Sequence, residues 1–163
     1  MSTSPPKPQI QIRRGSSKDA AAIALVLRES FNEYKSLYTD EGFAATTPGR
    51  EQILSRMTEG PLWIALLNNE MVGTVSVVLK GEALYIRGMA VLPAARGNQI
   101  GELLLKQVED WAGAHNCKRL FLSTTPFLHR AIRLYEKLGF RRTDQGPHDI
   151  FETPLFTMEK NPR

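Results

Sequence analysis

Residues 84–115 constrain most strongly what this chain can fold into. An apolar run from Leu84 to Leu92 is typical of a strand, and Pro93 ends it because proline cannot donate to a sheet ladder. A turn containing Gly97 follows. Apolar residues then recur at intervals of three or four, as on one face of a long helix. A strand, a glycine turn and an amphipathic helix in succession predict an α/β domain whose helix packs on a sheet.

The rest of the chain favours one such domain, with a coarse element order βααβββαβαββ. We expect a mixed central β-sheet, an antiparallel meander and then βαβαβ, flanked by helices. The turns Asn68-Asn69 and Lys80-Gly81 join the meander strands. The expected strands are 9–14 at an edge, 62–67, 72–79, 84–92, one around Leu120 and Leu122, 140–143 and 154–158. The expected helices are 17–33, 49–58, 100–115 and 125–139. Residues 34–48 are expected to form a loop.

Local signals place several helix ends. Ser16 and Asp19 have the spacing of a capping box, in which each residue satisfies a free backbone group at a helix start. Thr125 followed by Pro126 predicts that the last helix begins there, and Gly139 predicts its end.

Length and composition exclude several classes of protein. The chain has 163 residues and one cysteine, which excludes an internal disulfide framework and a cysteine-cluster metal site. No apolar run is long enough to cross a membrane, and a Ser/Thr/Pro-rich lead-in (1–8) lacks the apolar core of a signal sequence. We therefore expect a disordered 1–8, one domain over 9–160, a cytoplasmic protein and no membrane partner. A net charge of +4 suits an anionic ligand, but nucleic-acid binding is not expected, since basic residues form no stripe.

The turn before the long helix has the features of an anion site. The first turn of a helix presents unpaired N–H groups and the positive end of the helix dipole. Gly97 permits a tight turn there, Gly101 permits close approach, and Arg96 adds a positive charge. These features suit a pyrophosphate, although the Walker and dinucleotide glycine patterns are absent.

Residues 96–101 (Arg-Gly-Asn-Gln-Ile-Gly) resemble the acetyl-CoA pyrophosphate loop of the GNAT superfamily of N-acetyltransferases. A second segment, 131–140, is similar to the family's Ala-x-x-x-Tyr-x-x-x-Gly-Phe block. The resemblance covers about residues 60–143. Two positions depart from the family pattern: Gln99 stands where glycine is usual, and Leu128 stands where an asparagine often contacts the pantetheine arm.

The resemblance implies acetyl transfer from acetyl-CoA to a primary amine in a ternary complex. Backbone groups of Met89, Ala90 and Val91 would pair with the pantetheine arm, and a Met89 N–H would stabilise the oxyanion. Tyr135 would protonate the departing thiolate. The implied cofactor-binding residues are Met89, Ala90, Val91, Arg96, Gly97, Asn98, Gln99, Ile100 and Gly101, with Tyr135 as the catalytic residue and no metal.

The sequence leaves the general base and the acceptor open. The candidates for the base are Glu29, Glu33, Glu82, Tyr85 beside Arg87, His115 and His129, with His115 interpreted as a packed residue. We expect the acceptor groove in residues 31–48 and 144–156, whose aromatic and acidic groups are Tyr34, Tyr38, Asp40, Glu41, His148 and Asp149. These fit a small amine, a peptide N-terminus or a lysine.

One alternative is a non-catalytic acyl-CoA-binding sensor or scaffold, which would keep the loop and show no turnover. The resemblance is also compatible with a homodimer.

Overall fold

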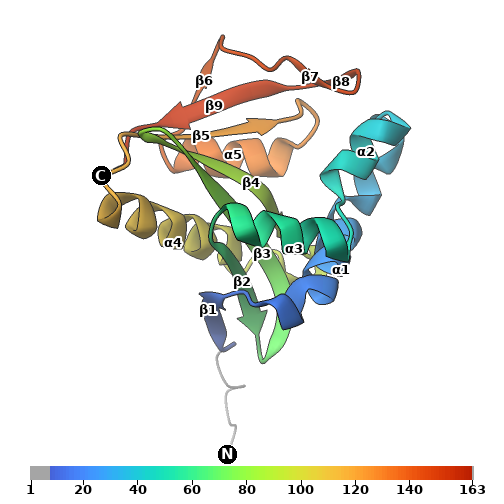
Figure 1. Ribbon diagram of the computed structural model, residues 1–163. Helices are drawn as coiled ribbons and strands as arrows, with labels where there is room; N and C mark the ends of the chain where they lie inside the picture. The colour runs from blue at the N-terminus through green and yellow to red at the C-terminus, as the bar shows by residue number, and fades with distance from the viewer. Residues whose placement is uncertain (1–7, 163) are drawn as a thin grey trace, which may run out of the picture.

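The computed structural model describes residues 8–162, so the expected disorder of 1–8 lies almost wholly outside the described residues. Seven strands form one twisted mixed sheet in the order β1-β2-β3-β4-β5-β9-β6 (Figure 1). The sheet strands are β1 (Ile10–Arg14), β2 (Leu62–Leu67), β3 (Glu70–Lys80), β4 (Ala83–Val91), β5 (Arg119–Thr124), β6 (Arg141–Thr143) and β9 (Phe156–Lys160). A separate hairpin joins β7 (Asp149–Ile150) to β8 (Thr153–Pro154).

The meander β2-β3-β4 is antiparallel, as predicted, and β1 lies at the sheet edge. Asn68 and Asn69 both have positive φ, which matches the twist of a tight hairpin turn. β4 then pairs in parallel with β5 through the connection that contains α4. The predicted fold class is therefore confirmed.

Helices cover both faces of the sheet, and a cluster of buried apolar side chains lies between the sheet and the helices on each face. α1 (Ala20–Phe31) and α3 (Arg50–Glu59) form one cluster with β2 around Ile23, Leu27 and Ile53. α4 (Ile100–Ala114) and α5 (His129–Lys137) pack on the other face, where Leu104, Leu105 and Val108 of α4 are fully buried. Burial of each such side chain stabilises the fold by about 2 kcal/mol.

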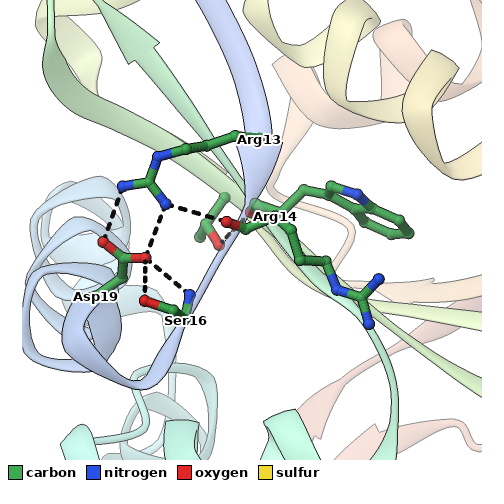
Figure 2. A network of polar contacts seen from close by, with 6 residues as sticks. Arg13, Arg14, Ser16 and Asp19 are labelled. Atoms are coloured by element: carbon green, nitrogen blue, oxygen red, sulfur yellow. Dashed lines mark hydrogen bonds and ion pairs between the residues drawn. The ribbon is translucent and has the colours of Figure 1, made fainter.

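The first helical segment confirms its predicted cap. The Ser16 N–H donates to the Asp19 carboxylate at 2.8 Å, and Arg13 of β1 donates to both Asp19 oxygens (Figure 2). A 3₁₀ turn η1 (Ser17–Asp19) leads into α1, and a second one, η2 (Asn32–Leu37), follows it. The network ties the edge strand to the start of the helix.

The loop predicted over 34–48 is wrong, because most of it is helical: η2 reaches Leu37, and α2 (Asp40–Thr46) follows after two extended residues. Thr39 caps α2 by accepting the Gly42 N–H at 3.0 Å. The Thr39 N–H donates to the Thr153 hydroxyl at 2.9 Å, and the Thr39 hydroxyl donates to the Phe151 carbonyl. The two segments, 114 residues apart, lie side by side in Figure 1, α2 beside β7 and β8. The hydrophobic periodicity of a sequence does not reveal hydrogen-bond partners that lie so far apart in the chain.

The predicted start of the last helix is also wrong. α5 begins at His129, not at Thr125, and Leu128 occupies the cap position. Residues 125–128 form a turn closed by the Leu128 N–H, which donates to the Thr125 carbonyl at 3.2 Å. Thr125 stays at the end of β5, with its hydroxyl oxygen buried. The end at Gly139 is confirmed, with a φ of 97° there.

Candidate active site

β4 and β5 separate halfway along their length. Their pairing runs from Ala83 with Arg119 to Ile86 with Leu122, and no described residue of β5 pairs with β4 beyond that point. The β3–β4 register shifts in the same region, at Gly88, whose φ is +60°. Such a bulge bends and twists a strand. β4 thereby leaves its neighbour, and one strand edge faces an opening.

A cavity of about 560 Å³ occupies this opening. That volume is in the range of small-molecule and cofactor sites. Its walls come from the end of α1, α2, α3, β4, the turn before α4, the end of β5 and α5. Eight of the nine predicted cofactor-binding residues line it, and they are Met89, Ala90, Val91, Arg96, Gly97, Gln99, Ile100 and Gly101.

Asn98, the ninth predicted residue, does not line the cavity. Its Nδ2 donates to the Ala95 carbonyl at 2.9 Å, within the turn that follows η3 (Pro93–Ala95). Asn98 therefore stabilises the loop from outside the cavity.

Two residues of this loop have left-handed backbone. Gly97 has a φ of 90°, with open space where a side chain would stand. Gln99 has a φ of 61° and precedes the first residue of α4, where the family pattern usually has glycine. Gln99 is exposed at the rim of the cavity, so its side chain is not buried in the core. The loop thus keeps its conformation with Gln99 in place of glycine. The left-handed backbone at Gln99 costs about 1 kcal/mol of strain.

Gly101 permits a close approach, as predicted, but by side chains of the protein itself. A Cβ there would lie 2.7 Å from Leu134 Cδ2 and 3.2 Å from Met89 Cε. The glycine therefore lets α4, α5 and β4 meet at one point.

Tyr135 lies at this same point. Its hydroxyl donates to Met89 Sδ at 3.9 Å, and its ring packs edge-on against Phe140, with ring centroids 5.8 Å apart. Burial raises the pKa of the phenol well above its usual value. A phenol in this environment stays protonated at neutral pH and can act as an acid.

Arg96 lines the cavity and forms an ion pair with Glu33 of η2. This pair joins the loop to the segment after α1. It also engages Glu33, one of the candidate bases.

The other candidate bases are mostly remote from the cavity. Glu29, Glu82, His115 and His129 do not line it, and His115 stacks on Trp111 at the end of α4, with ring centroids 3.7 Å apart. Tyr85 is the candidate that does line it, beside Arg87.

The residues expected to form the acceptor groove divide between the cavity and the surface. Tyr34 and Tyr38 line the cavity, but Asp40, Glu41, His148 and Asp149 are exposed elsewhere. Two further residues that no sequence pattern indicated, Arg56 of α3 and Thr125 with its buried hydroxyl, also line the cavity. A single arginine on a polar helix carries no pattern that would have revealed it.

Within residues 8–162 no three His, Cys, Asp or Glu side chains gather as a metal site would require. None of the described helices has the length and apolar character needed to span a bilayer.

The cavity thus combines an open strand edge with the N-terminus of a helix, an arrangement that can accept an extended ligand arm and an anionic group. Residues 24–140 match the model of the Acetyltransferase (GNAT) family. The chain belongs to this family and is an acetyl-CoA-dependent N-acetyltransferase.

Individual relatives agree. An uncharacterised N-acetyltransferase of Escherichia coli, YjgM, is 30% identical over 139 residues, which is 82% of this chain and 83% of that protein. An IAA acetyltransferase of Azospirillum brasilense is 37% identical over 86 residues, 52% of this chain and 55% of that protein. The fold matches the PaiA N-acetyltransferase of Thermoplasma acidophilum, solved with coenzyme A, with a TM-score of 0.81 at 20% identity, over 94% of this chain and 99% of that one. None of these findings supports the non-catalytic sensor.

Proposed function

We propose that the enzyme transfers the acetyl group directly to a primary amine in a ternary complex, within the cavity along β4. One observation carries this proposal. The Tyr135 hydroxyl faces Met89 where β4 leaves β5, in the same cavity as the loop 96–101. An acid, an open strand edge and an anion site thus share one space.

Residues 96–101 are proposed to bind the pyrophosphate of acetyl-CoA. The N–H groups at the start of α4 supply donors, and the helix dipole favours negative charge there. Arg96 adds a guanidinium in the same wall, already oriented by Glu33. Gly97 leaves open space beside the backbone, which allows a phosphate to approach closely.

The edge of β4 from Met89 to Val91 is proposed to bind the pantetheine arm as an added strand would bind. The family's asparagine is replaced by Leu128, which lines the cavity. The Thr125 hydroxyl oxygen is buried beside it, close to the Tyr38 phenol. We assign to Thr125 the polar contact that Leu128 cannot make.

For the chemical step, the Met89 N–H is proposed to donate to the oxyanion that forms at the acetyl carbonyl. Tyr135 then donates its proton to the departing thiolate. The amine must lose a proton before it attacks. Among the lining residues Tyr85 remains a candidate base, either directly or through a water molecule.

The first experiment is calorimetric titration of acetyl-CoA into the wild type and into an Arg96→Ala variant, which leaves the packing around Gly101 intact. Micromolar binding by the wild type, lost in the variant, supports the assignment of the loop. Equal binding by both proteins would contradict it.

The second experiment measures free thiol release by Tyr135→Phe under saturating acetyl-CoA. General acid catalysis contributes about 10²–10⁴-fold to rate, so kcat should fall by about that factor. The dissociation constant of acetyl-CoA and the melting temperature should change little, because only one hydroxyl is removed. An unchanged kcat would remove Tyr135 from the mechanism.

We also assign residues 9–160 to one acetyltransferase domain and propose a cytoplasmic location. Limited proteolysis and cell fractionation test these assignments. A homodimer remains a prediction, which light scattering on the purified protein checks.

A further inference from the structure

Two arginines from different elements lie together in the wall of the cavity. Arg56 comes from α3 and Arg87 from β4. A Cβ on Gly88 would lie 2.9 Å from Nη1 of Arg56, so the guanidinium of Arg56 rests directly against the β4 backbone. The next residue along β4 is Met89. The positive charge therefore lies beside the strand segment to which the proposed function assigns acetyl transfer.

The charges of these arginines are not fully balanced by the protein. Arg87 forms an ion pair with Glu59, whose side chain is 47% exposed. Nε of Arg87 is buried without a hydrogen-bond partner, and Arg56 makes no ion pair or side-chain hydrogen bond with residues 8–162. One carboxylate, that of Glu59, thus faces two guanidinium groups.

The other charged groups of the cavity do not correct this imbalance. The lining residues include two further arginines, Arg130 and Arg96, of which Arg96 is paired with Glu33, and a single carboxylate, Glu102. Glu102 accepts from Lys137 Nζ at 2.6 Å, in the first turn of α4. Histidine is absent from the lining residues described. The cavity therefore has an excess of positive charge.

Keeping two like charges together in a half-buried site costs free energy. Burial, and then the charge of Arg87, lower the pKa of the Arg56 guanidinium. The cost is offset where an anion completes the arrangement, since charge-assisted bonds from arginine to an oxyanion are strong.

We propose that the acceptor is a small amino acid whose carboxylate binds Arg56 and Arg87 while its amine faces the acetyl group at Met89. This inference rests on the proposed function and specifies its acceptor. The acceptor site proposed here is basic, whereas the groove expected from the sequence contained acidic groups. Of those groups, Asp40, Glu41 and Asp149 lie outside the cavity.

The geometry favours a carboxylate close to the amine. A guanidinium presents two parallel N–H groups that match the two oxygens of a planar carboxylate. Arg56 contacts Gly88, one residue from the Met89 N–H proposed to hold the oxyanion. The amine and the anionic group must then lie a few bonds apart, as in an α- or β-amino acid. A polyamine would be repelled by the same pair.

The test compares acceptors that differ only in charge. With saturating acetyl-CoA, thiol release is measured for the twenty amino acids and β-alanine, for the matching carboxamides of those that react, and for phosphoethanolamine and spermidine. We expect at least one amino acid to react with a kcat/KM at least tenfold above that of its carboxamide.

The variants test the role of Arg56. Arg56→Gln should raise the KM of the preferred amino acid by about 10- to 100-fold and change that of its carboxamide less than threefold. Arg56→Lys should recover part of the loss, since it restores the charge without the planar fork. Arg50→Gln is the matched control, because Arg50 lies on the same helix, is exposed and pairs with Glu51 outside the cavity.

Several outcomes would overturn the inference. One is a preference of the enzyme for spermidine, for phosphoethanolamine or for carboxamides. Another is an equal effect of Arg56→Gln on the KM of an amino acid and of its carboxamide. A third is that no amino acid reacts although acetyl-CoA binds. Failure of acetyl-CoA to bind would instead refute the proposed function itself, so the two failures are distinguishable.

Discussion

Gly88 and Arg56 are in direct contact: a Cβ added at Gly88 would lie 2.9 Å from Nη1 of the Arg56 side chain. The contact requires both the missing side chain and the φ of +60° at the β4 bulge. The same glycine thus bends β4 away from β5 and provides space for a guanidinium. One residue thereby links the opening of the cavity to its charge.

Gly88→Ala is expected to weaken acceptor binding. The left-handed φ costs an alanine about 1–2 kcal/mol, and the new methyl group displaces Arg56. Gly81→Ala is the matched control, because Gly81 has a φ of +63° with no atom near its added Cβ. Both variants should lose similar thermal stability, but only Gly88→Ala should raise the KM of the acceptor. Equal KM values in the two variants would show that the contact with Arg56 has no role in binding.

Gln99→Gly is expected to bind acetyl-CoA as tightly as the wild type or up to about threefold more tightly. The substitution removes the strain of a side chain at φ 61°, and exposed Gln99 loses no packing. Gln99→Val should bind about tenfold more weakly, because a β-branched residue fits this conformation poorly. Calorimetric titration of acetyl-CoA measures both constants. Weaker binding by the glycine variant would mean that the Gln99 side chain itself contributes.

Tyr135 is expected to stay protonated in alkaline solution. Its folded pKa is raised by burial, so the phenol contributes stability that is complete below pH 10 and is lost as the pH rises above that value. Absorbance titration should therefore show the same number of tyrosinates at pH 11 in the wild type and in Tyr135→Phe. One fewer tyrosinate in the variant would show that Tyr135 titrates normally.

Asp19 is expected to make folding sensitive to acid. The hydrogen bonds from Arg13, followed by those from Ser16, lower its pKa to about 2 (Figure 2). A depressed pKa means that the stability is present above about pH 4 and is lost as the pH falls toward 2. The carboxylate is 14% exposed, so we expect a contribution of about 1–2 kcal/mol after allowance for solvent screening.

Urea unfolding at pH 7 and at pH 3 checks this expectation. Asp19→Asn should lower the free energy of unfolding more at pH 7 than at pH 3. Asp110→Asn is the control, because Asp110 is exposed on α4 and should change neither value appreciably. An Asp19→Asn effect independent of pH would exclude the carboxylate charge as its source.

Much of the fold could be predicted because its signals are local. β2 has the predicted bounds, 62–67, and α3 differs from its predicted range by one residue at each end. The segment 34–48 could not be predicted, because α2 depends on bonds from Thr39 to residues near Thr153. Seven residues are too few for a helix to be stable alone, so only a distant partner explains it.

The predictions for the site divide in the same way. The cofactor residues follow one another along the chain, from the end of β4 into α4, so a short motif indicated them and eight of the nine line the cavity. Arg56, Arg87 and Thr125 come from three different elements, α3, β4 and the end of β5. No spacing in the sequence relates them.

The sequence by itself thus determined the element types, the meander and the loop before α4, because each depends on neighbouring residues. Only the tertiary structure decided where β4 leaves β5 and which charged side chains meet in the cavity. It also placed Asp40, Glu41 and Asp149 outside the cavity. The physical reason is that these features depend on packing between residues far apart in the chain, where burial and charge act through space and leave no periodic trace in the sequence.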